Sequence, residues 1–175
     1  MNNLNTSILI LLIVLILAVF QDIKFYKIKN ITIIVGLFLG IVLNIFLKLK
    51  FTTKNEIISK VICILVLIFC YLIKAIGAGD VKLFIVCAFF VDEVSFINII
   101  IQSFLIGAII SIVKILNEKR INEIYLKINL IIRDILEGRV DRIDIDKTKK
   151  ENIIHFSIPI LLATIANTFI NINLI

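Results

Sequence analysis

Gly77-Ala78-Gly79-Asp80-Val81-Lys82-Leu83 is the stretch that decides the fold, because it places a carboxylate between two long apolar runs. An ionisable group in a bilayer is costly, at about 2.5–3.5 kcal/mol for Asp at the centre of an inserted helix. The two glycines before the acid lack a Cβ and would let a second backbone approach it. The stretch therefore predicts both a break between two helices and a functional acid at that break.

The composition around this stretch is that of an integral membrane protein. Of the 175 residues, 61% are hydrophobic, and the mean hydropathy is +1.12. Uncharged runs that approach about 20 residues are long enough to cross a bilayer as helices. We therefore expect an all-α, polytopic membrane protein with a single integral membrane domain over residues 1–175.

Six apolar runs predict about six transmembrane helices. They cover Leu4–Phe20, Ile31–Leu47, Val61–Ile76, Val81–Val91, Val94–Leu116 and Ile153–Ile175. The first run has no basic segment before it and no small-residue cleavage site after it, so we expect a retained helix rather than a signal peptide. The fourth run is too short to cross an average bilayer unaided. A re-entrant fourth segment, which would leave five crossings, is therefore the alternative.

The positive charges favour six crossings. With the N-terminus outside, fifteen of the 19 Lys and Arg residues fall in cytoplasmic loops, as the positive-inside rule requires. A re-entrant fourth run would move the most basic loop outside. These loops also account for the net charge of +6 without a nucleic-acid partner, since no separate basic domain is present. We expect a multi-pass protein of a prokaryotic cell membrane.

The only long polar stretch, about 117–152, forms the last cytoplasmic loop in this topology. Apolar residues within Ile121–Leu136 repeat at helical spacing and predict an amphipathic helix on the membrane surface. The alternative is a role in guiding substrate, in which Asp141, Asp144 and Asp146 attract a basic leader peptide.

Asp22 and Asp80 are the candidate catalytic pair. Asp22 lies just after the first predicted helix and Asp80 just before the fourth, and the predicted topology places both at the cytoplasmic ends of these helices. Helices so placed can be neighbours in a small bundle. Two carboxylates that meet cannot both ionise cheaply, so one keeps a proton. The ionised partner can then activate a water, while the protonated one binds a scissile carbonyl. This is aspartyl protease chemistry, which needs no metal or cofactor.

Other catalytic chemistries have little support in the sequence. The chain has a single His, no Gly-x-Ser-x-Gly nucleophile motif, and three cysteines that lie apart within apolar runs. We interpret Cys63, Cys70 and Cys87 as apolar packing residues rather than disulfide or metal partners.

The two acidic segments resemble the signature of the type IV prepilin peptidases. That family has a first Asp followed by a short basic segment ending in Ile-Pro-Asn, and then Gly-x-Gly-Asp-x-Lys. This chain reads Asp22-Ile23-Lys24-Phe25-Tyr26-Lys27-Ile28-Lys29-Asn30 and Gly77-Ala78-Gly79-Asp80-Val81-Lys82. The second motif matches in full, and the first departs at Lys29, where the family usually has Pro. The segment Ile154–Pro159 is loosely similar to the proline-containing sixth helix of the family.

The resemblance implies a cytoplasm-facing aspartyl endopeptidase with Asp22 and Asp80 as its catalytic pair. Its substrate would be a prepilin or pilin-like protein, cleaved beside its basic leader, with pilus or secretion machinery as a further partner. Family members that also methylate the product commonly carry paired Cys-x-x-Cys motifs, which this chain lacks. We therefore expect the peptidase-only type that serves Flp/Tad pili or archaeal preflagellins.

Several further residues are candidates for supporting roles. We expect Gly77 and Gly79 to give a non-helical approach to Asp80. Motif and supporting positions are Gly77, Gly79, Lys82, Lys27 and Asn30, with Asn30 expected to cap the second helix and Lys82 to snorkel or to tune Asp80. Gly36 and Gly40 predict close helix packing within the chain. His155 is interpreted as an interfacial or buried polar residue.

Three alternative functions stay open. The first is an intramembrane protease of the presenilin or signal-peptide-peptidase type, which shares Gly-x-Gly-Asp but places its first Asp inside a helix, commonly after Tyr. Here Gln21 precedes Asp22. The second is a small proton- or cation-coupled transporter, although no inverted repeat is visible in the sequence. The third is a catalytically inactive assembly factor of a pilus system.

Overall fold

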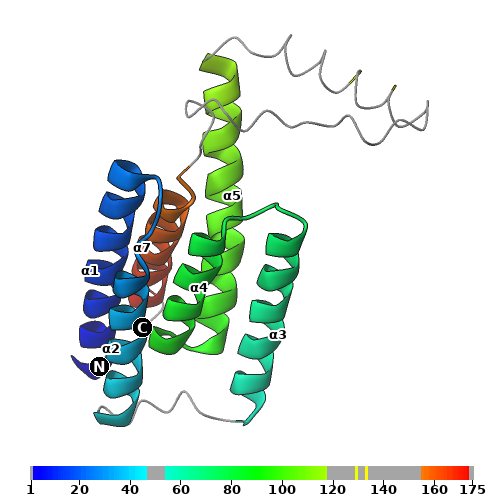
Figure 1. The fold of residues 1–175 in the computed structure, drawn as a ribbon. Helices are drawn as coiled ribbons and strands as arrows, with labels where there is room; N and C mark the ends of the chain where they lie inside the picture. The colour runs from blue at the N-terminus through cyan, green and yellow to red at the C-terminus, as the bar shows by residue number, and fades with distance from the viewer. Residues whose placement is uncertain (1, 47–53, 118–128, 130–132, 134–154, 174–175) are drawn as a thin grey trace. The chain divides into compact units, whose positions relative to one another are not determined.

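The computed structural model describes residues 2–46, 54–117, 129, 133 and 155–173, and these residues form helices joined by short turns. The helices are α1 (Asn2–Phe25), α2 (Asn30–Phe46), α3 (Lys54–Leu72), α4 (Ala78–Phe90), α5 (Glu93–Asn117) and α7 (Ser157–Asn173). The predicted all-α class is therefore confirmed for the described part of the chain (Figure 1).

Three of these helices are long and apolar enough to cross a membrane. The candidate spans are Thr6–Phe25, Lys54–Leu72 and Glu93–Lys114. The apolar helices α2 and α7 are shorter, and α4 has only 13 residues. The prediction of about six crossings thus stays a prediction, while the described residues contain three helices long and apolar enough to cross a membrane.

The chain divides into two compact units, which we describe separately. The first comprises Met1–Ile106 with His155–Ile175, and the second comprises Gly107–Ile154. In the second unit, the described residues are the end of α5 and the two helical residues Asn129 and Arg133. The amphipathic helix predicted within 121–136 otherwise lies outside the described residues, as do Asp141, Asp144 and Asp146. Both candidate catalytic acids belong to the first unit.

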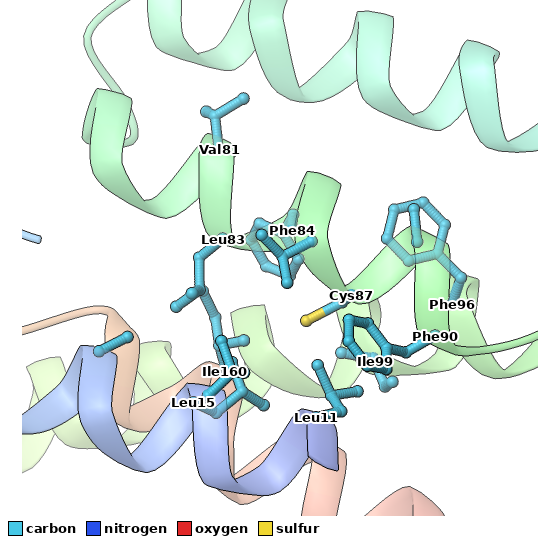
Figure 2. Packing of buried hydrophobic residues seen from close by; sticks show 14 of the residues in the cluster. Leu11, Leu15, Val81, Leu83, Phe84, Cys87, Phe90, Phe96, Ile99 and Ile160 are labelled. Atoms are coloured by element: carbon cyan, nitrogen blue, oxygen red, sulfur yellow. The ribbon is translucent and has the colours of Figure 1, made fainter. Parts of the chain in front are cut away.

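The core of the first unit forms around α4, which packs against α1, α2, α3 and α7. Figure 2 shows side chains of α4 meeting those of α1, α5 and α7 in this core. The fully buried residues include Leu11, Leu15, Leu83, Phe84, Cys87, Phe96, Ile99 and Ile160. In contrast, α3 leaves many large apolar side chains exposed, as a surface that faces lipid does. All three cysteines are free, in line with their interpretation as packing residues.

Gly36 and Gly40 let α2 pack closely on its neighbours. A Cβ on Gly36 would lie 3.0 Å from methyl groups of Val14 in α1 and of Val86 in α4. A Cβ on Gly40 would lie 2.9 Å from the Cβ of Phe89. The prediction that these glycines serve helix packing within the chain is confirmed.

The far end of α4 is capped by side chains from the two helices that flank it. Lys60 of α3 donates hydrogen bonds from Nζ to the carbonyl oxygens of Ala88, at 2.9 Å, and Val91, at 2.6 Å. Asn44 of α2 donates to the Phe89 carbonyl at 2.6 Å. The last carbonyl oxygens of a helix have no hydrogen-bond partner within the helix, and an unpaired carbonyl is strongly unfavourable in lipid. These caps explain how a short helix can end inside a membrane protein.

Candidate active site

Asp22 lies in the last turn of α1. The prediction that it follows the helix is wrong, because nothing between Gln21 and Phe25 is a proline or glycine that would stop helix formation. The helix ends at Tyr26, whose φ of 54° is left-handed and whose N–H donates to the Asp22 carbonyl at 2.8 Å. Left-handed residues of this kind commonly end helices. The Asp22 side chain is therefore held by regular helix rather than by a loop.

The short connection after α1 is fixed to both helices that it joins. Oε1 of Gln21 accepts hydrogen bonds from the Lys29 backbone N–H, at 3.1 Å, and from the Thr32 hydroxyl, at 2.8 Å. Ile28 is buried, and its Cδ1 lies 3.5 Å from the position of a Cβ on Gly79. The connection that carries the first acidic motif thus packs directly on the second.

Asp80 lies in the first turn of α4, not before the helix as predicted. Gly77 is the N-cap and is extended, with φ −74° and ψ 148°, whereas Gly79 is already helical. The expectation of a non-helical approach is thus met at Gly77 and is wrong at Gly79. The φ of Gly77 suits any residue, but a Cβ there would lie 2.8 Å from Oδ2 of Asp80, so a side chain at this position would displace the Asp80 carboxylate.

Helix α1 packs against α4, and the charge of the Asp22 carboxylate acts on Asp80. Asp80 lies outside the three candidate spans. Burial and, second, the negative charge of Asp22 raise the pKa of Asp80 to about 7; a backbone hydrogen bond at Gly77 and the nearby His155 act in the opposite direction. Near neutral pH, Asp80 can therefore hold a proton beside Asp22.

Two side chains from the start of α7 meet Asp22. The Ser157 hydroxyl donates to Oδ2 of Asp22 at 2.6 Å. Nδ1 of His155 lies 3.4 Å from the same oxygen but makes no hydrogen bond, although the nitrogen is buried. The Tyr26 ring lies beside the imidazole, with centroids 5.3 Å apart. His155, which the sequence analysis interpreted only as an interfacial or buried polar residue, is thus part of the site.

Sequence reasoning missed Ser157 altogether. The only available signal was the pair of polar residues His155 and Ser157 just before Pro159, near the beginning of an apolar run. Pro159 does not interrupt that run, because α7 begins at Ser157 and the proline falls in its first turn, where a backbone N–H is not needed.

The remaining predicted site residues lie around the pair. Lys82 donates from Nζ to Oδ1 of Asn30 at 3.0 Å, and so links the start of α4 to the start of α2. Asn30 is the first residue of α2, and its side-chain oxygen is engaged with Lys82. Lys27 is exposed on the connection between α1 and α2.

Comparison with known proteins places the chain in a family. The sequence model of the type IV leader peptidase family matches residues 9–112, more than half of the chain, and the chain belongs to that family. No curated protein and no solved structure gives a match. The matched range contains Asp22 and Asp80 and ends before His155 and Ser157. The chain is thus a peptidase-family membrane protein whose family acts on prepilin-like substrates.

Proposed function

We propose that this protein is an aspartic endopeptidase that cleaves the basic leader from prepilin-like proteins at the cytoplasmic face of the membrane, with Asp22 and Asp80 as its catalytic pair. The observation that carries the proposal is the partly buried Asp80 beside Asp22, since the charge of Asp22 raises the pKa of Asp80. Paired titrating carboxyls with different surroundings are the pattern of an acid and a base working together.

The surroundings of the two acids support different roles for them. Asp22 accepts a hydrogen bond from Ser157 and lies near His155, contacts that favour an ionised carboxylate. Asp80 is the member that holds the proton. Asp22 is therefore the general base that takes a proton from water, and Asp80 donates a hydrogen bond to the carbonyl oxygen of the peptide bond to be cleaved.

The reaction then proceeds in two steps. The water oxygen attacks the carbonyl carbon as its proton moves to Asp22, and the proton of Asp80 moves to the carbonyl oxygen, which gives a neutral tetrahedral diol. As the C–N bond breaks, the amine leaves with the proton from Asp22 and one hydroxyl returns its proton to Asp80. Both carboxyl groups end in their starting states, so no metal or covalent intermediate is needed.

Six crossings with the N-terminus outside complete the proposal. In this arrangement both acids lie at cytoplasmic helix ends, where the basic leader of a prepilin meets its apolar segment. The distribution of Lys and Arg supports this orientation.

Co-expression with a prepilin tests the proposal. Asp22→Asn and Asp80→Asn should each abolish processing while the protein still inserts into the membrane, because an amide cannot exchange the shared proton. Asp92→Asn is the matched control, since Asp92 caps α5 by accepting the Ser95 N–H at 3.2 Å, next to the C-terminal end of α4, whereas Asp80 lies at its N-terminal end. Wild-type processing by either catalytic variant would overturn the proposal. Sequencing the product distinguishes a cut beside the leader from one inside the apolar segment, which would favour an intramembrane protease.

A further inference from the structure

His155 and Ser157, at the start of α7, converge on one oxygen of Asp22. Ser157 is fully buried, and its hydroxyl donates to Oδ2 of Asp22 at 2.6 Å. A charge-assisted O–H···O⁻ bond of this length is among the stronger hydrogen bonds in proteins. Because α1 and α7 pack side by side, this single bond joins residues that are 135 positions apart in the sequence.

The imidazole of His155 lies close to Asp22 but does not hydrogen-bond to it. Its Nδ1 is 3.4 Å from the same Oδ2, is buried, and has no hydrogen-bond partner. A buried polar atom without a partner costs about 1–3 kcal/mol, so its position calls for an explanation. In the absence of substrate, hydrogen bonds at catalytic centres are often long, and they shorten when the reaction complex forms. The Tyr26 ring, in contact with the imidazole, limits how the ring can turn.

The neighbouring lysines are engaged elsewhere. Nζ of Lys24 lies 5.5 Å, and Nζ of Lys29 4.6 Å, from the centre of the Phe25 ring, while Lys82 is bonded to Asn30. The titratable groups that face His155 are Asp22 and Tyr26 from α1 and its end, and Asp80 from α4. His155 is therefore well placed to supply donor or positive charge to the acidic pair.

We propose that Ser157 and His155 are positioning residues that hold Oδ2 of Asp22, so that the other oxygen, Oδ1, receives the proton from water and Asp22 stays the ionised member of the pair. This inference rests on the proposed function. It extends the active site beyond the two acidic motifs to a third element, α7, which lies outside the range matched by the family.

Initial cleavage rates of a purified prepilin, measured from pH 4 to 9, test the inference. Ser157→Ala should lower kcat by about tenfold to a hundredfold, the range for a lost hydrogen bond to a charged group, with little change in KM. His155→Phe removes the donor that would close on Oδ2 in the reaction complex and should lower kcat in the same direction. The acidic limb of the pH profile should move to higher pH, because the ionised form of Asp22 has lost a donor. Ser157→Thr keeps the hydroxyl and His155→Asn keeps a donor near the position of Nδ1, so both should recover much of the rate.

Ser103→Ala is the matched control, because Ser103 is also fully buried but donates to the Ile99 carbonyl within α5. Its acidic limb should stay in place. Equal loss of rate at every pH in Ser157→Ala, with no recovery in Ser157→Thr, would show that Ser157 has only a structural role and overturn the inference. Wild-type rates and profiles in both loss-of-donor variants, with Asp22→Asn inactive, would refute the inference and leave the proposed function standing. An active Asp22→Asn would refute both.

Discussion

Replacement of Asp80 by Asn should make the protein more stable, and increasingly so as the pH rises. The ordinary pKa of 3.8 is raised to about 7 in the folded protein, because burial and the charge of Asp22 oppose ionisation. Below about pH 4, the carboxyl is protonated in both the folded and the unfolded chain and costs nothing. Between about pH 4 and pH 7, the unfolded chain releases the proton while the folded protein retains it, so stability falls through this window and then levels off.

The raised pKa sets the size of this effect. A rise from 3.8 to about 7 corresponds to about 4 kcal/mol against the ionised form, and screening by water at a partly exposed carboxyl reduces this to about 2 kcal/mol. Somewhat more than half of this loss of stability falls between pH 5 and pH 8. For a chain of this size, we expect the difference in Tm between Asp80→Asn and the parent to grow by about 3 °C over that interval.

A thiol-reactive dye provides the assay, because Cys87 is fully buried in the core. Cys63 and Cys70 are only partly buried, so both should first be replaced by Ala. Thermal unfolding in detergent then exposes Cys87 to the dye. Asp92→Asn is the control: Asn caps a helix as well as Asp, so its curve should run parallel to that of the parent. Parallel curves for Asp80→Asn, or a difference that shrinks with rising pH, would refute the reasoning.

Three other changes test the packing and the chemistry. Lys60→Met removes a charged donor from two carbonyls and should destabilise the protein by about 2–3 kcal/mol in the dye assay, whereas Lys54→Met, at an exposed position, should not. Gly40→Val places a Cβ 2.9 Å from that of Phe89 and should lower the free energy of unfolding by about 1–3 kcal/mol. Gly79→Ala is the control and should be tolerated, because its new Cβ has no neighbour closer than 3.5 Å. Equal losses of stability in the two variants would contradict this reasoning. Cleavage should survive EDTA, because the carboxyl pair activates water directly; loss of activity that zinc restores would show a metal-dependent reaction.

Local sequence signals predicted much of this protein. Apolar periods and lengths predicted the helices, whereas a shared site for Asp22 and Asp80, inferred from the loop charges and the two acidic motifs, stays a prediction. Helix ends were less predictable, because the end of α1 depends on a single left-handed residue, Tyr26, that carries no glycine signal. The sequence did not show the second feature of Gly77, which is that a Cβ there would meet Oδ2 of Asp80.

Contacts between distant segments could not be predicted from the sequence. The bond from Ser157 to Asp22 exists because α7 packs along α1, and no spacing or composition rule specifies which helices of a bundle become neighbours. The caps that Lys60 and Asn44 place on α4 depend in the same way on α2 and α3 flanking it.

The shortness of α4 has a consequence for the surrounding lipid. Its 13 residues give a rise of about 20 Å, about 10 Å less than the hydrocarbon thickness of a typical bilayer. Polar groups lie at both ends of α4: Asp80 is near its N-terminus, and the carbonyl oxygens that accept hydrogen bonds from Lys60 are at its C-terminal end. Hydrophobic mismatch of this size is met by local thinning of the bilayer or by polar groups that draw in water. Under the proposed function, a helix this short would shorten the path by which water reaches Asp80, and the cleavage rate should then depend on the acyl-chain length of the surrounding membrane.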